Sequence, residues 1–122
     1  MAKKIIIAED DKFLANAYRL KLEKEGFEIE IVANGRELIA KIPEFKPNII
    51  LLDLLMPLMD GFEALEILKS DKNTKNIPVL IMSNLGQQSD IDKGKELGAK
   101  DYIIKSNISL KKVIEKIEGL LK

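Results

Sequence analysis

The sequence predicts a doubly wound α/β fold, in which helices cover both faces of one five-stranded parallel sheet. Five short apolar runs, rich in β-branched residues, recur along the 122 residues, and amphipathic helical patterns separate them. Five successive βα units joined by right-handed crossovers give this architecture. A closed βα barrel needs eight such units, and the chain is too short to supply them.

The five predicted strands differ in how evenly apolar they are. Residues 4–8, 48–52 and 78–82 show no polar alternation, which is typical of parallel strands buried on both faces. Residues 28–32 alternate between polar and apolar, so we expect this strand at an edge of the sheet. The last strand is the short run 102–104.

Apolar residues spaced three and four apart predict the helices between these strands. Gly26 is suited to end the first helix, and Asn34 to cap the second, which we expect to end before Pro43. The fourth helix is the weakest, because only Ile91 and Leu97 are large and apolar there, and we expect it to be mobile. The predicted helices cover residues 13–25, 35–42, 62–68, 87–97 and 110–121.

The composition excludes several kinds of chemistry. The chain has 20 basic and 20 acidic residues and contains no histidine, cysteine or tryptophan. It therefore has no Ser-His-Asp triad, no thiolate zinc site and no disulfide. The zero net charge argues against direct nucleic-acid binding, which depends on a basic excess. The apolar runs are too short for a signal peptide or a membrane span, so we expect one cytoplasmic domain over residues 1–122, without membrane contact.

Polar or charged residues follow four of the five predicted strands. Glu9, Asp10 and Asp11 follow the first strand, Asp53 the third, Ser83 the fourth and Lys105 the fifth. In open parallel sheets, ligands bind at the carboxyl ends of the strands, near the switch in strand order. Strand order 2-1-3-4-5, that of (βα)5 flavodoxin-like sheets, would bring Glu9, Asp10 and Asp53 together. Clustered carboxylates repel one another unless a cation joins them, and oxygen ligands select a hard ion such as Mg²⁺.

The hydroxyl and the lysine at the same edge suit a phosphoryl group. Placed opposite Mg²⁺, Ser83 and Lys105 would complete a pocket for a dianion, and Asp53 could attack phosphorus to form an aspartyl phosphate. Simpler interpretations remain open for three of these residues. Asp11 could serve only as a helix N-cap, Ser83 only as a turn residue and Lys105 only as a surface charge.

Together these residues resemble the receiver domain of two-component response regulators, the CheY-like family, over essentially the whole chain. The resemblance lies in Glu9-Asp10-Asp11, in residues 53–61 (DLLMPLMDG), in Ser83, and in Tyr102 three residues before Lys105. It implies that Asp53 is the phospho-acceptor. It also implies that Glu9, Asp10 and the backbone carbonyl of Leu55 join Asp53 in holding Mg²⁺. Ser83 would bind the phosphoryl group, Lys105 would pair with it, and Tyr102 would be a switch that turns inward when Ser83 moves.

Two positions depart from the usual family pattern. Ser106 follows Lys105 where proline is common, and a cis peptide bond before a non-proline residue costs about 2.5–4 kcal/mol. The departure therefore leaves two possibilities, a constrained cis bond or a different loop around Lys105. Asn84 follows Ser83 where a smaller residue is frequent, and it could narrow access to Asp53.

Two other residues bear on the interpretation of the site. Leu55 cannot orient an attacking water, which predicts a fairly long-lived phosphoryl group on Asp53. It also argues against an aspartyl phosphatase of the haloacid dehalogenase type, which requires an aspartate at this position. Tyr102 has an alternative interpretation as an ordinary edge-strand tyrosine with its ring packed and its hydroxyl in water.

The resemblance implies a protein donor and a protein target. The donor would be a sensor histidine kinase or a phosphotransfer protein, which agrees with the absence of histidine from this chain. The output would be a changed surface on residues 87–97, 102–104 and 110–121, which would engage a downstream protein or a second copy in a homodimer. The chain would then be a phospho-acceptor and not an enzyme. The alternative is a pseudo-receiver, an interaction module of the same fold that is not phosphorylated.

Overall fold

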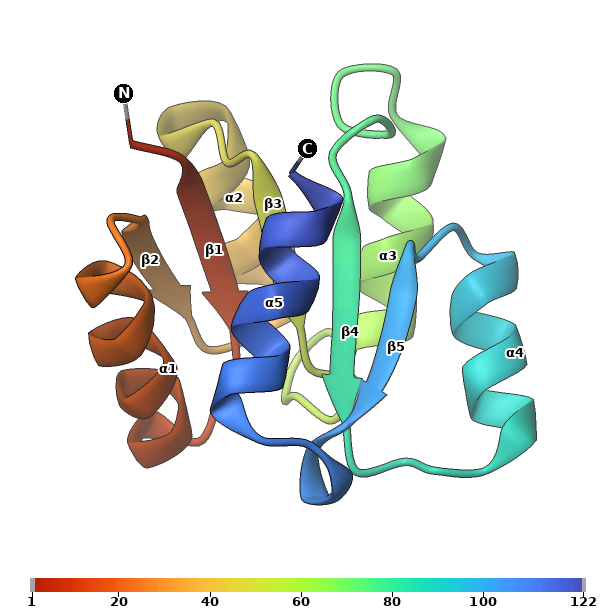
Figure 1. Cartoon of the computed structure of the whole chain (residues 1–122). Coiled ribbons are helices and arrows are strands. Elements are labelled where there is room, and N and C mark those ends of the chain that lie inside the picture. The colour runs from red at the N-terminus through yellow and green to blue at the C-terminus, as the bar shows by residue number, and fades with distance from the viewer. Residues whose placement is uncertain (1, 122) are drawn as a thin grey trace.

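A computed structural model describes residues 2–121, and its centre is the predicted five-stranded sheet (Figure 1). Every strand pairing is parallel and the order is β2-β1-β3-β4-β5, which confirms the predicted fold class and strand order. The half-buried β2 lies at an edge, also as predicted. The strands are β1 (Lys4–Ala8), β2 (Glu28–Val32), β3 (Ile49–Leu52), β4 (Val79–Ser83) and β5 (Asp101–Ile104).

Helices cover both faces of this sheet, which separates two apolar cores. α1 and α5 pack on one face, where Ile7, Leu22 and Ile117 belong to one buried cluster, while α2 and α3 pack on the other, where Leu38 and Leu65 are buried (Figure 1). α4 lies beside β5. The helices are α1 (Lys12–Lys24), α2 (Gly35–Phe45), α3 (Gly61–Ser70), α4 (Gln88–Glu96) and α5 (Leu110–Leu120), and a 3-10 turn (Lys105–Asn107) follows β5. Among residues 2–121, no helix is both long and apolar enough to cross a membrane.

Local capping explains where most helices begin. Side-chain oxygens of Asp11, Asn34, Asp60 and Ser109 accept hydrogen bonds from backbone N–H groups in the first turns of α1, α2, α3 and α5. α4 has no side-chain cap, and the residue that it buries is Gly94, so it is the most weakly anchored helix, as the sequence predicts.

The end of α2 differs from the prediction. The helix continues through Pro43 to Phe45, so the prediction that it ends before Pro43 is wrong. Proline fixes φ at a helical value and removes one intrahelical hydrogen bond, and the buried Ile42 before it and the partly buried Phe45 after it both pack on the core and hold the helix. The helix ends instead at Lys46, whose N–H donates to the Ile42 carbonyl at 2.8 Å. The strand boundaries also shift slightly, and Ser83 is the last residue of β4 rather than the residue after it.

The left-handed backbone conformation of Lys46 predicts that glycine at this position would stabilise the protein. Its φ of 55° is a conformation that glycine adopts without steric cost. We expect Lys46→Gly to raise the free energy of unfolding by about 0.5–1 kcal/mol, measured by urea denaturation. Ala40→Gly, in the interior of the same helix, should lower it by about 1 kcal/mol. A loss of stability in both variants would contradict the prediction.

Candidate functional site

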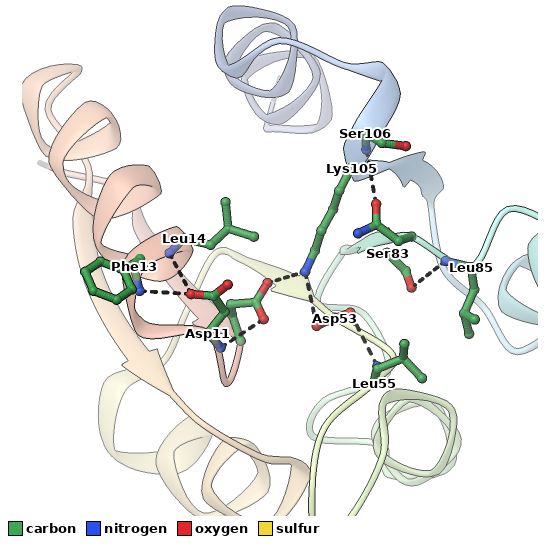
Figure 2. A network of polar contacts seen from close by, with 11 residues as sticks. Asp11, Phe13, Leu14, Asp53, Leu55, Ser83, Leu85, Lys105 and Ser106 are labelled. Carbon is green, nitrogen blue, oxygen red and sulfur yellow. Dashed lines mark hydrogen bonds and ion pairs between the residues drawn. The ribbon is translucent and has the colours of Figure 1, made fainter.

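The register of the sheet brings the predicted site residues to one edge. Ala8 of β1 pairs with Leu52 of β3, so the next residues, Glu9 and Asp53, leave the two strands side by side. Ser83 of β4 pairs with Ile104 of β5, so Lys105 emerges beside Ser83. The carboxyl ends of four strands therefore deliver four polar groups to one place (Figure 2).

Lys105 joins the two buried carboxylates. Its Nζ donates hydrogen bonds to Oε1 of Glu9 and to Oδ2 of Asp53, the latter at 3.1 Å (Figure 2). All three side chains are largely buried: the exposed fraction is 13% for Lys105, 4% for Glu9 and 8% for Asp53. Charges removed from water to this extent are stable only when they are paired, so an interpretation of Lys105 as a mere surface charge is wrong.

The cluster holds more negative charge than positive charge, because two buried carboxylates share one lysine. Burial raises the pKa of Glu9 from 4.5 to about 7, and the neighbouring Asp53 adds to the rise although Lys105 opposes it. Burial alone would lower the pKa of Lys105, but the hydrogen bond that it donates to Glu9 and the charge of Asp53 raise the pKa above its ordinary value. One lysine thus remains charged between two carboxylates that it does not fully compensate. A further cation would relieve the remaining repulsion.

The carboxylates suit a hard cation. Glu9, Asp10 and Asp53 each offer an oxygen, and these three oxygens lie within 4.8 Å of one another. Two of the carboxylates are oriented by backbone donors: Leu55 N–H donates to Asp53 Oδ1 at 3.3 Å, and Asp11 N–H donates to Glu9 Oε2 at 3.2 Å. Asp10 is exposed and can turn toward an ion from the solvent side. Carboxylate oxygens without nitrogen or sulfur ligands fit Mg²⁺, as predicted from the sequence.

Asp11 stands outside this cluster. Its Oδ1 accepts from Phe13 N–H at 3.0 Å and from Leu14 N–H at 3.2 Å, which confirms its interpretation as the N-cap of α1 (Figure 2). The acidic run after β1 is therefore divided between two tasks. Glu9 and Asp10 face the site, and Asp11 starts a helix.

Comparison with known proteins identifies the family that this arrangement belongs to. A family model described as the response regulator receiver domain matches residues 5–118. The chain belongs to this family. The chemotaxis protein CheY of Thermotoga maritima is 37% identical to this chain over 107 residues, which cover 86% of this chain and 87% of that protein. The receiver therefore shares most of its length with a CheY protein.

Other relatives of the receiver are longer. The DNA-binding dual master transcriptional regulator RpaA of Synechocystis is 31% identical over 119 residues, which cover 98% of this chain and 49% of RpaA. The chain spans about half the length of this and other DNA-binding or transcriptional relatives.

Solved structures agree with the family. A CheY-like receiver domain protein of Methanospirillum hungatei superposes with a TM-score of 0.90 at 30% identity, covering 99% of this chain and 94% of that one. The phosphorylated cyanobacterial phytochrome response regulator RcpA superposes with a TM-score of 0.83 at 32% identity, covering 98% and 91%.

Ser83 and Tyr102 of the receiver meet at the backbone of the β4–α4 loop. Ser83 is fully buried, and its Oγ accepts from Leu85 N–H at 3.2 Å. The Tyr102 hydroxyl donates to the Leu85 carbonyl at 2.5 Å. Tyr102 is thus anchored at its hydroxyl rather than freely solvated, and its ring lies against Gly94 of α4, where a Cβ would come within 3.2 Å of the ring.

The two departures from the family pattern contact each other. The Lys105–Ser106 peptide bond is trans, and Lys105 nevertheless reaches both Glu9 and Asp53. The N–H of Ser106 donates to Oδ1 of Asn84 at 3.1 Å, a contact that sequence reasoning missed because it joins residues 22 positions apart.

Tyr18 is a second residue that sequence reasoning missed. It lies buried on α1 and lines the same small hollow as Glu9 and Asp53, and burial raises the pKa of its phenol. The available signal was a tyrosine among the aliphatic residues of the predicted helix 13–25.

Proposed function

We propose that residues 1–122 form a cytoplasmic, phospho-accepting receiver domain. Asp53 takes a phosphoryl group from a sensor histidine kinase or phosphotransfer protein with the help of Mg²⁺. The observation that carries this proposal is Lys105, which lies between Glu9 and Asp53 at the carboxyl ends of the parallel strands. A buried nucleophilic carboxylate beside a fixed cation and further carboxylate ligands is the arrangement that phosphoryl transfer requires.

Each residue has a distinct task in the transfer. Asp53 Oδ attacks phosphorus, a new O–P bond forms, and the bond to the donor breaks with its electron pair leaving on the donor atom. Lys105 and the hydroxyl of Ser83 bind the phosphoryl oxygens, and Lys105 neutralises part of their charge. Glu9, Asp10, Asp53 and the carbonyl of Leu55 would hold Mg²⁺, which supplies the remaining positive charge.

A protein donor is supported by the surface around Asp53. Leu55 is a large apolar side chain that lies exposed two residues after Asp53, Leu58 is exposed in the same loop, and Phe13 is exposed at the start of α1 (Figure 2). Exposed apolar side chains grouped at a reactive centre are typical of a contact between proteins. The chain itself has no histidine, so the phosphorylated imidazole must come from the partner.

The output surface that we propose comprises α4, β5 and α5. Tyr102 connects β5 to the loop that follows Ser83, and α4 is the least anchored helix, so both can respond to a change at the site. This surface would contact a downstream protein or a second copy of the chain. Its charged residues include Asp90, Lys93, Lys111, Lys112 and Glu115.

We infer no direct nucleic-acid contact by this domain, because its 20 basic residues are balanced by 20 acidic ones. The domain is a signalling module rather than an enzyme that turns over a substrate.

Phosphorylation by a small donor tests the proposal. The protein is incubated with Mg²⁺ and acetyl phosphate, and its intact mass is measured. We expect the wild type to gain one phosphoryl group and Asp53→Asn to gain none. Absence of an adduct on the wild type with saturating donor would favour the pseudo-receiver alternative.

The lifetime of the adduct is a second expected result. Leu55 is exposed and apolar at the position from which a polar side chain could orient water toward Asp53. We expect dephosphorylation to be slow, with a half-life well above seconds in Mg²⁺ buffer, measured by mass after removal of acetyl phosphate. Leu55→Asn, which restores a polar side chain, should shorten the half-life. A half-life of only seconds in the wild type would contradict this expectation.

A further inference from the structure

The turn that presents Lys105 has little to hold it in place. The 3-10 turn Lys105–Asn107 has three residues, no side-chain cap and no buried residue. Short 3-10 turns have poorer hydrogen-bond geometry than α-helices and do not persist on their own. The position of the Lys105 backbone must therefore be fixed by contacts with other elements.

Asn84 supplies such a contact from the neighbouring loop. Its side-chain Oδ1 accepts the N–H of Ser106 at 3.1 Å, directly after Lys105 in the chain (Figure 2). Asn84 directly follows Ser83, whose hydroxyl lies in the same site, and the next residue, Leu85, is held by the hydroxyl of Tyr102. Two successive loop residues are thus attached to β5 and to the turn that follows it.

We propose that Asn84 is a positioning residue for Lys105. The hydrogen bond from Ser106 to Asn84 ties the turn that carries Lys105 to the loop that begins at Ser83, so the two phosphoryl-binding groups are held at a constant separation. This inference rests on the proposed function, since it assigns to Lys105 the binding of the phosphoryl group. Without the bond, the turn samples other positions and Lys105 spends less time within reach of Asp53.

The rate of phosphorylation by acetyl phosphate in Mg²⁺ tests this role. We expect Asn84→Ala to slow phosphorylation by about threefold to tenfold, the range that corresponds to the loss of one hydrogen bond. Ser106→Ala is the matched control, because it keeps the backbone N–H and should react at the wild-type rate. In a Lys105→Ala background, Asn84→Ala should have less than about a twofold effect, because residues that act through one another are not additive.

Hydrogen exchange at the Ser106 amide gives a readout that does not depend on phosphorylation. We expect this amide to exchange several times faster in Asn84→Ala than in the wild type, with the melting temperature little changed. Three results would each overturn the inference. The Ser106 amide could exchange at the wild-type rate in Asn84→Ala, or Asn84→Ala could be phosphorylated at the wild-type rate. Asn84→Ala could also slow phosphorylation as much in the Lys105→Ala background as in the wild type. If the wild type took up no phosphoryl group, the proposed function would fail and the assignment to Lys105 with it. If the wild type took up the phosphoryl group and Asn84→Ala did so at the same rate, the positioning role of Asn84 alone would be overturned.

Discussion

Lys105→Met is expected to slow the phosphorylation of Asp53 by acetyl phosphate by about 100-fold or more. Removing one preorganised group that stabilises developing charge typically costs about 10²–10³ in rate. The proposed function makes Lys105 such a group, because Lys105 is buried and pairs with Asp53 at 3.1 Å, beside the oxygen that would attack phosphorus. The measurement is the pseudo-first-order rate of phosphoryl uptake by mass. Lys116→Met is the matched control, since Lys116 pairs with Asp101 at the surface of β5 and should leave the rate unchanged.

The same variant is expected to lower the stability of the metal-free protein in a pH-dependent way. Loss of one partner from a buried ion pair typically costs about 3–5 kcal/mol, and we expect about 2 kcal/mol at pH 8, because Glu9 can escape part of the cost by binding a proton. In the wild type the pKa of Glu9 is raised by burial from 4.5 to about 7, so the folded state binds more protons than the unfolded state between these values. Stability contributed by Glu9 therefore falls as pH rises through this window.

Lys105→Met removes the hydrogen bond that holds the pKa of Glu9 down and so raises that pKa further. The difference in stability between wild type and variant should be largest near pH 8 and should shrink toward pH 5, where Glu9 is neutral in both. Urea denaturation at the two pH values measures this difference. A loss of stability that is equal at both pH values would show that Lys105 does not act through the charge of Glu9.

Mg²⁺ is expected to raise the stability of the wild type, and Asp10→Asn is expected to abolish that response. A ligand present at roughly 10–20 times its Kd stabilises the folded state by about 1.5–2 kcal/mol, which is about 4–8 °C in melting temperature for a domain of this size. Asp10 is the exposed member of the three carboxylates whose oxygens lie within 4.8 Å, so its replacement removes a proposed ligand and disturbs little packing. Thermal denaturation with and without millimolar Mg²⁺ measures the effect.

The neighbouring acid provides the control for this experiment. Asp11→Asn removes the same charge one residue later, where the side chain caps α1 and does not face the cluster. It should therefore keep the stabilisation by Mg²⁺. An unchanged wild-type melting temperature, or an equal loss of the response in Asp10→Asn and Asp11→Asn, would count against the metal site.

Much of the fold and of the site could be predicted because both follow from the strands. Runs of β-branched residues identify buried parallel strands, and the carboxyl ends of such strands meet at one edge. Glu9, Asp53 and Lys105 are separated widely in sequence, and they converge because each is the first residue after its strand. No knowledge of side-chain directions was needed for this prediction.

What could not be predicted depends on tertiary packing and on the direction of side chains. The proline in α2 is a local signal for a helix end, and the packing of Ile42 before it and Phe45 after it outweighs that signal. The amide of Asn84 turns toward Ser106, and the hydroxyl of Tyr102 turns toward Leu85. These orientations are set by loops whose conformation has no periodic signal in the sequence, so they appear only once the backbone is known.

The location of the phosphoryl group tests the central claim most directly. The protein is treated with acetyl phosphate and Mg²⁺, the adduct is reduced with borohydride, and the peptides are sequenced by mass spectrometry. Reduction converts an aspartyl phosphate to homoserine, so we expect homoserine at position 53 in the wild type, and much less of it when Mg²⁺ is omitted. Modification at another residue, or equal modification of Asp53 without Mg²⁺, would contradict a receiver site built from Asp53, Lys105 and the carboxylates of Glu9 and Asp10.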